Sequence, residues 1–369
     1  MLRRKIVYIV SDVEKSLAFE WMAAHFNSRA ELFFLLIGKR QTALISFLEQ
    51  TGVRYQVVAD EDGASFFRKW LAVLSLLRRE RPHVVHAHLW RAQLMGMTAA
   101  WLLRVPKRIF TRHHAALHHE VYPTGLKWDK LCNRLATGIV AISQNVQNIL
   151  TQWEGAAPAK IHLIHHGFDL AYFAQPDPQA VASLRQRHGV PPRRPVIGVI
   201  ARYLELKGIP YVVEAFKTIR KEFPEAFLIL ANAHGVYAPV IKKSLADVPA
   251  EAYKEVIFEN DLASLYAVMD IFVHVPTGPH VEAFGQTYVE ALAAGVPAVF
   301  TLSGVAPEFI VDRKNACVVA FRNAGDIASA ISNIWQNDAL RENLVTEGKR
   351  SVQPFSLENM LHKLETLYA

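Results

Sequence analysis

The segment that decides the fold spans residues 280–291 and reads HVEAFGQTYVEA. An apolar run, Ile271–Val275, precedes it. Gly295-Val296-Pro297 closes it, and a second apolar run covers residues 298–301. Glycine commonly ends a helix in the left-handed conformation, and short apolar runs next to such a stop are typical of buried strands. The order therefore predicts strand, loop, helix, glycine stop and strand.

Two carboxylates stand eight residues apart in this segment. Glu282 is expected in the loop before the helix, and Glu290 about two turns further, roughly 12 Å along the axis. The helix N-terminus between them offers free N–H groups and the positive end of the helix dipole, which favour phosphate. The alternative is two glutamates on a solvated helix face. The arrangement indicates a site that takes a sugar, a diphosphate and a ribose in that order.

The chain of 369 residues is half apolar and one-fifth charged, a size and composition typical of two globular domains. Short apolar runs alternate with helical patterns, for example Phe66–Arg79 and Ile209–Glu222. This alternation predicts an α/β protein with two doubly wound parallel sheets. Residues 173–195, rich in Pro, Gln and Arg, indicate the junction. The expected strands are 6–10, 32–37, 55–58, 84–87, 108–111, 138–142, 161–164, 196–201, 226–231, 256–258, 271–275, 298–301 and 316–319.

Segment 280–291 resembles the Glu-x7-Glu motif of retaining GT-B glycosyltransferases of the family 4, group 1 type. The resemblance implies two Rossmann-like domains that face a cleft. Residues 1–170, with about 352–369, would form the N-terminal acceptor-side domain, and 171–351 the nucleotide-sugar-binding domain. The C-terminal helix would cross back to the N-terminal domain. The matching residues are Glu282, Phe284, Gly285, Glu290, Ala291, Gly295 and Pro297.

Two cations follow the strand expected at residues 196–201. Arg202 and Lys207 stand five apart, before Gly208, and resemble the family's Arg-x4-Lys-Gly element. Two cations at the mouth of a cleft can hold a diphosphate and neutralise it as it leaves. Surface cations in a basic protein are the alternative. Arg202 and Lys207 supply two positive charges without a metal, so metal-independent chemistry with no cofactor is expected. The expected donor-binding residues are Arg202, Lys207, Glu282, Phe284, Gly285, Gln286, Thr287 and Glu290.

Histidines follow a strand of the front half. Thr111 and His113 match a Thr-x-His of the family, whose histidine faces the donor sugar, and His114 is the competing choice. His118 and His119 raise the possibility of a zinc site, but no cysteine or acidic ligand is expected to join these adjacent pairs, so no metal is expected. The expected catalytic residues are His113, Glu282, Arg202 and Lys207, and the candidate acceptor-side residues are Ser11, His86 and His114.

The net charge of +7 is unevenly distributed along the chain. Residues 1–170 hold 22 Lys and Arg against 13 Asp and Glu, or +9, and residues 171–369 hold 19 against 21, or −2. No nucleic-acid-binding motif is visible, so an anionic membrane surface or a phosphorylated acceptor is favoured, with a solvated surface as the alternative. The sequence FFRKWL at residues 66–71 predicts an amphipathic helix that meets anionic lipid. The rival hypothesis places Phe67, Trp70 and Leu71 in the core.

A cytoplasmic protein, peripheral at the inner face of the cytoplasmic membrane, is expected. Cys132 and Cys317 fit no disulfide or metal pattern, and the chain has no apolar run of 18 residues. Its start reads as a strand rather than a signal peptide, because the apolar run covers only residues 6–10.

The function expected from the resemblance is retaining transfer of a hexose-type sugar from a UDP- or GDP-sugar to a glycan or lipid-linked acceptor. The family's front-face mechanism would apply, in which the leaving phosphate oxygen accepts the acceptor's proton. Two alternatives stay open: a sugar-nucleotide epimerase of the same fold, and a non-catalytic nucleotide-sugar-binding partner. The base, the sugar, the acceptor and the oligomeric state also stay open.

Overall fold

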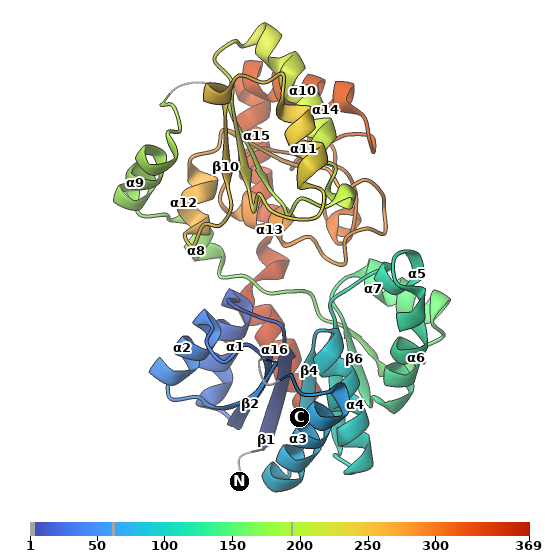
Figure 1. Ribbon diagram of the computed structural model, residues 1–369. Coiled ribbons are helices and arrows are strands. Elements are labelled where there is room, and N and C mark those ends of the chain that lie inside the picture. Colours follow the sequence, from blue (N-terminus) through green and yellow to red (C-terminus); the bar gives the residue numbers. More distant parts are fainter. Residues whose placement is uncertain (1–3, 61–62, 193–194) are drawn as a thin grey trace. The chain divides into compact units, whose positions relative to one another are not determined.

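The computed structural model describes residues 4–60, 63–192 and 195–369, and the chain divides into two compact units (Figure 1). The first unit combines Met1–Gly167 with Glu358–Ala369, and the second is Phe168–Leu357. The boundaries expected from the sequence lie after residue 170 and at about residue 352. Each unit carries its own parallel sheet and its own core.

The first unit is built on a seven-stranded parallel sheet in the order β3-β2-β1-β4-β5-β6-β7. The chain order reverses between β1 and β4, where such folds bind ligands beyond the carboxyl ends of the strands. The strands are β1 (Lys5–Ser11), β2 (Glu31–Gly38), β3 (Arg54–Ala59), β4 (Val84–His88), β5 (Lys107–Arg112), β6 (Gly138–Ala141) and β7 (Ile161–Leu163). The helices are α1 (Leu17–Asn27), α2 (Ala43–Gln50), α3 (Phe66–Glu80), α4 (Trp90–Leu102), α5 (Leu117–Glu120), α6 (Leu126–Leu135), α7 (Gln144–Asn148) and, from the end of the chain, α16 (Leu357–Tyr368).

The second unit has a six-stranded parallel sheet in the order β10-β9-β8-β11-β12-β13, with its reversal between β8 and β11. The strands are β8 (Val196–Ile200), β9 (Phe227–Ala231), β10 (Tyr253–Val256), β11 (Ile271–His274), β12 (Ala298–Phe300) and β13 (Cys317–Val318). The helices are α8 (Leu170–Ala174), α9 (Pro178–His188), α10 (Ile209–Glu222), α11 (Ala238–Leu245), α12 (Leu262–Ala267), α13 (Gln286–Ala293), α14 (Ala324–Gln336) and α15 (Asp338–Ser351).

Two expectations are wrong in detail. Strand β10 ends where the expected strand 256–258 begins, because Ile257 and Phe258 are exposed and lie outside the sheet. The expected junction at residues 173–195 is largely helical. Asp177 caps α9 by accepting a hydrogen bond from the amide of the second helical residue, and Gly189 ends the helix in the left-handed region.

The C-terminal helix α16 completes the core of the first unit. The Tyr368 hydroxyl lies 2.8 Å from the Tyr8 hydroxyl and also contacts His86 Nδ1. The Tyr368 ring packs against Phe26. All of these side chains are buried, so α16 is an integral part of this unit.

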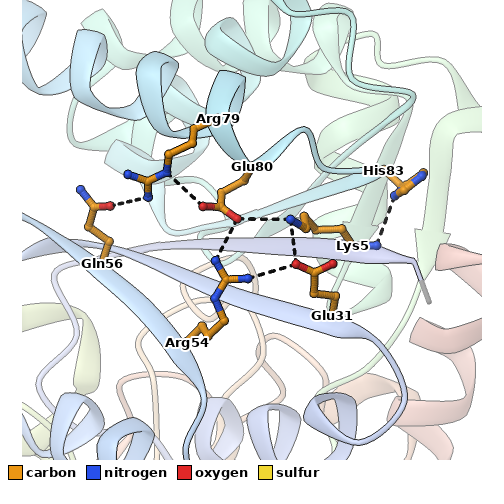
Figure 2. Close-up of polar contacts among 7 residues, drawn as sticks. All are labelled: Lys5, Glu31, Arg54, Gln56, Arg79, Glu80 and His83. Atoms are coloured by element: carbon orange, nitrogen blue, oxygen red, sulfur yellow. Dashed lines mark hydrogen bonds and ion pairs between the residues drawn. The ribbon is translucent and has the colours of Figure 1, made fainter. Parts of the chain in front are cut away.

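A charged network ties the end of α3 to the sheet (Figure 2). The Glu80 side chain is 6% exposed and accepts hydrogen bonds from Lys5 Nζ at 3.3 Å, Arg54 Nη2 at 3.2 Å and Arg79 Nε at 3.2 Å. Glu31 joins Lys5 and Arg54 at 2.7 and 3.0 Å. Burial alone would raise the pKa of Glu80, but the hydrogen bonds from Arg79 and Lys5 and the Arg54 charge lower it. The carboxylate thus joins α3 to β1 and β3.

Replacing Glu80 by Gln should lower the free energy of unfolding by about 1.5–3 kcal/mol, because three charge-assisted hydrogen bonds weaken at a mostly buried site. Urea denaturation at pH 7 measures the change. Glu31→Gln is the control: its carboxylate is 43% exposed, so its loss should stay below about 1 kcal/mol. Equal losses in the two variants would contradict the prediction.

Candidate functional site

An ion pair between a partly buried lysine and a buried glutamate lies at the sheet reversal of the second unit. Lys207 follows β8, Glu282 follows β11, and the Lys207 ammonium bonds to the Glu282 carboxylate. Nε2 of His274, the last residue of β11, lies 3.2 Å from Glu282 Oε1. Burial alone would raise the pKa of Glu282, but the Lys207 charge and the His274 contact lower it to about 2. Glu282 is therefore a carboxylate at neutral pH.

The segment after β12 fixes the loop that carries Glu282. The Glu282 amide donates to Ser303 Oγ at 3.1 Å, and Ser303 Oγ donates to the Pro279 carbonyl at 3.2 Å. Gly304 has φ of 61°, and a Cβ there would lie 2.5 Å from the Phe284 carbonyl oxygen and 2.8 Å from Glu282 Cβ. Only glycine lets the two segments approach so closely. The sequence did not indicate Ser303, Gly304 or His274, although His274 lies within the expected strand 271–275.

The N-terminus of α13 is open to a ligand. Its N-cap, Gly285, has φ of 85° and provides no side-chain hydrogen bond to the helix. The Thr287 hydroxyl in the first turn is buried and has no hydrogen-bond partner among the described residues. Free N–H groups, the helix dipole and this hydroxyl suit a phosphate. The Phe284 side chain is buried and packs against Phe168 and Phe355, so it anchors the loop.

Glu290 is the second acid of the segment. Helix α13 begins at Gln286, so Glu290 lies about one turn inside the helix and not two as expected. The Tyr266 hydroxyl donates to Glu290 Oε2 at 2.8 Å. Burial raises the pKa of Glu290 to about 7, although the bond from Tyr266 opposes the rise. Tyr266 was also missed, because it lies on α12, outside the motif.

Arg202, the other expected cation, lies in a different environment from Lys207. Arg202 is exposed, and its side chain makes no hydrogen bond or ion pair with the part of the chain that the structure describes. Gly208, with φ of 69°, ends the Lys207 turn, and a Cβ there would lie 2.1 Å from the Val275 carbonyl oxygen. The Lys207 turn therefore packs directly against the end of β11.

The first unit brings the expected histidines to the ends of β4 and β5. His113 Nε2 lies 3.2 Å from His88 Nδ1, and the His113 ring stacks on His166 at 5.6 Å between centroids. His86 is fully buried, and its Nε2 lies 2.8 Å from Thr111 Oγ1.

Ser11, another candidate acceptor-side residue, is also buried, and its hydroxyl accepts a bond from the Ala92 amide at 3.3 Å. The side chains of Ser11 and His86 thus already make hydrogen bonds in the interior of the first unit.

His114, His118 and Asp129 form a group that could hold a metal ion. His118 Nδ1 lies 2.6 Å and His114 Nε2 3.6 Å from Asp129 Oδ2. The sequence predicts no acidic ligand there, but Asp129 on α6 is one. Arg112 Nη1 lies 2.9 Å from Asp129 Oδ1 and also pairs with the buried Glu154. The positive charge of Arg112 therefore compensates the negative charge of Asp129 without a metal.

The expectation of metal-independent chemistry overlooked the acidic stretch Asp60-Glu61-Asp62, which has the Asp-x-Asp spacing. Asp60 is held by Arg91 at 2.6 Å and by Lys69. The hydrogen bond from Arg91 lowers the pKa of Asp60. Glu61 and Asp62 lie outside the described residues.

Two family models match the chain. The model described as glycosyl transferases group 1 matches residues 181–351, and the model described as glycosyltransferase family 4 matches residues 41–172. The first match contains Arg202, Lys207, Glu282 and Glu290, and the second contains His113.

Named relatives agree with the models. A GDP-mannose-dependent alpha-(1-6)-phosphatidylinositol monomannoside mannosyltransferase of Mycolicibacterium smegmatis is 31% identical over 178 residues, 46% of this chain and 45% of that protein. The capsular polysaccharide biosynthesis glycosyltransferase CapM of Staphylococcus aureus is 25% identical over 82% of this chain and 81% of its own. The alpha-monoglucosyldiacylglycerol synthase of Acholeplasma laidlawii is 28% identical over 52% of this chain and 47% of its own. The chain thus aligns with about half the length of two of these relatives.

Solved structures share the fold. Anabaena HepE in complex with UDP and glucose superposes with a TM-score of 0.86 at 21% identity, covering 99% of both chains. A glycosyltransferase from Rickettsia africae superposes with a TM-score of 0.80 at 19% identity, covering 99% of this chain and 98% of its own.

The raised pKa of Glu290 predicts a pH-dependent stability. The folded protein holds this proton more tightly than the unfolded chain between about pH 4.5 and 7, so this contribution to stability falls as pH rises through that window. Glu290→Gln cannot ionise. Its free energy of unfolding relative to wild type should therefore rise by about 2–3 kcal/mol between pH 5 and pH 8. Urea denaturation at both pH values measures this difference, with the exposed Glu342→Gln as control. A difference that does not change with pH would contradict the assignment.

Proposed function

The chain belongs to the group 1, family 4 glycosyltransferases and has the GT-B fold, and we propose that it transfers a hexose-type sugar from a nucleoside-diphosphate sugar to a glycan or lipid-linked acceptor with retention of configuration. The observation that carries this proposal is the succession in the second unit of the Lys207–Glu282 pair, the open N-terminus of α13 and Glu290 one turn behind it. These three features suit the sugar, the diphosphate and the ribose of one ligand.

Each residue has a separate task in this scheme. The Glu282 carboxylate accepts hydrogen bonds from sugar hydroxyls. Lys207, Arg202 and the first amides of α13, from Gln286 and Thr287, hold the diphosphate and neutralise the charge that develops as it leaves. The Glu290 carboxyl bonds the ribose hydroxyls, and Tyr266 keeps it in place.

The transfer itself follows the front-face mechanism that the resemblance implies. The acceptor oxygen forms its bond to the anomeric carbon on the face that the phosphate leaves. The acceptor's proton passes to the leaving phosphate oxygen, so protein nucleophile and metal are both unnecessary. We assign His113 a hydrogen bond to a substrate oxygen, as the family's Thr-x-His implies.

The names of the relatives support a choice of donor and acceptor. One is named for GDP-mannose and a phosphatidylinositol mannoside acceptor, another for a diacylglycerol glycolipid, and HepE was solved with UDP and with glucose. We therefore propose a UDP- or GDP-hexose as donor and a lipid-linked or glycan acceptor.

The decisive experiment is incubation with a panel of UDP- and GDP-hexoses, with and without a membrane extract as acceptor source. We expect acceptor-dependent release of the nucleoside diphosphate at a rate that excess EDTA does not reduce. Isomerised sugar without acceptor would instead identify an epimerase, and binding without turnover a non-catalytic partner. A strict requirement for added Mg²⁺ or Mn²⁺ would reject the metal-free scheme.

Site variants are the controls for this assay. Arg202→Ala should lower kcat by about tenfold or more with little change in stability, because the side chain is exposed. Glu290→Ala should weaken binding of the sugar-free nucleoside diphosphate by about 1.5–3 kcal/mol in calorimetry. The exposed Lys221→Ala on α10 should change neither quantity. Unchanged nucleotide affinity in folded Glu290→Ala would remove the ribose role.

We also propose that the first unit contacts anionic lipid at the cytoplasmic face of a membrane. The helix α3 packs Val73, Leu76 and Leu77 inward and leaves Phe66 and Phe67 exposed, with Phe67 at 64%. This arrangement favours the membrane hypothesis over the rival that places Phe67 in the core. Among the described residues, no helix is long and apolar enough to cross a bilayer.

Flotation with anionic vesicles at low salt tests this contact. Arg68 and Arg78 on α3 are the useful positions, because Lys69 and Arg79 also hold Asp60 and Glu80. A double Arg68→Gln, Arg78→Gln variant should bind roughly 30-fold more weakly, at about 1 kcal/mol for each charge. Neutralising Lys221 and Lys254 in the second unit is the matched control. Binding that is absent in the wild type, or equal in both double variants, would refute the contact.

A further inference from the structure

Two histidines of the first unit make a direct contact that the proposed mechanism does not yet use. His88 is the last residue of β4 and is 3% exposed, whereas His113 is partly exposed just after β5. Their Nδ1 and Nε2 atoms are 3.2 Å apart, a hydrogen-bond distance. The contact joins the interior of the sheet to the edge where β4 and β5 end.

The His88 ring is surrounded by other rings. Phe19 meets it edge-to-face at 5.0 Å between centroids, Tyr8 at 5.4 Å, and His86 lies at 4.1 Å. Its second nitrogen, Nε2, is buried without a hydrogen-bond partner among the described residues. Burial lowers the pKa of both His88 and His113, so both rings are neutral near pH 7. A neutral imidazole carries one N–H donor and one acceptor nitrogen.

Only two proton arrangements make the observed bond. In the first, His113 donates from Nε2, and the proton of His88 then lies on its Nε2, as a buried N–H without an acceptor. In the second, His88 donates from Nδ1, and only a lone pair of His88 stays without a partner. Folded proteins tolerate a buried acceptor without a partner more readily than a buried donor. The second arrangement is therefore favoured.

We propose that His88 is a positioning residue that fixes His113 as the tautomer protonated on Nδ1, so that His113 presents an N–H donor to the substrate. His113 Nδ1 makes no hydrogen bond within the described residues, so it is available for a ligand. The His166 ring stacked on His113 limits rotation out of this plane. This inference rests on the proposed hydrogen bond of His113 to the substrate.

The tautomer decides what His113 can do. A ring protonated on Nδ1 and occupied by His88 on Nε2 has no free lone pair, so it cannot accept the acceptor's proton. It can only donate a hydrogen bond to a substrate oxygen. This agrees with a mechanism in which the leaving phosphate oxygen receives that proton.

Histidine nitrogen shifts measure the tautomer without any assay of activity. In protein labelled with ¹⁵N-histidine, long-range proton–nitrogen correlation spectra separate the two tautomers, and loss of signals in His113→Phe assigns the ring. We expect wild-type His113 to be protonated on Nδ1. Protonation on Nε2 would overturn the proposal, whether or not the protein proves to be a transferase.

Two substitutions of His88 separate positioning from packing. The amide nitrogen of Asn is the same number of bonds from Cα as histidine Nδ1, so His88→Asn can still donate to His113, whereas His88→Leu cannot. The Asn variant should keep the tautomer and most of kcat. The Leu variant should mix the tautomers and lose about tenfold in kcat with a smaller change in KM, the effect of one hydrogen bond.

Tyr8→Phe is the matched control. It perturbs the same cluster by removing the bond to Tyr368, and it should leave the His113 tautomer unchanged. Equal loss of kcat in His88→Asn and His88→Leu with an intact His113 tautomer would show a purely structural role and overturn the proposal. If His88→Leu does not fold, the wild-type spectrum and His88→Asn still decide.

Discussion

Both sheets are parallel throughout, and this constraint determines where polar side chains can gather. In a parallel sheet all carboxyl ends lie at one edge, and a reversal of strand order opens a crevice there. Lys207 and Glu282 are 75 residues apart in sequence, yet they meet because β8 and β11 are neighbours across such a reversal. The contact between His88 and His113 has the same origin in the first unit, where β4 pairs with β5.

The two glutamates of the motif show how position sets protonation. Both are buried on one short segment, but Lys207 lies beside Glu282 and keeps it ionised, with a pKa of about 2. Glu290 has a tyrosine hydroxyl instead of a cation, and burial raises its pKa to about 7. One acid is thus ionised at neutral pH, and the other exchanges its proton near neutrality. Their eight-residue spacing alone does not reveal this difference.

The sequence predicted both sheets and the strand–loop–helix segment around Glu282. Hydrophobic periodicity, helix-ending glycines and apolar runs are all local signals. It could not predict Ser303, Gly304 and Tyr266, since each reaches the site from another element through the fold. The expected strand 256–258 failed for a similar reason: the apolar pair Ile257 and Phe258 follows the strand, and pairing with β9 decides its bounds. The helix α9 was missed because Pro, Gln and Arg suggested a linker, although Asp177 and Gly189 mark its ends.

The position of Tyr368 in the core bears on the order of folding during synthesis. The interior around Tyr8 and His86 is incomplete until the chain has been made as far as residue 368. All residues of the second unit leave the ribosome before that point, and none of its strands depends on the first sheet. Domains usually fold from the N-terminus onward during translation. Here the unit that is made first is the last to be finished, so its core stays incomplete while the rest of the chain is translated.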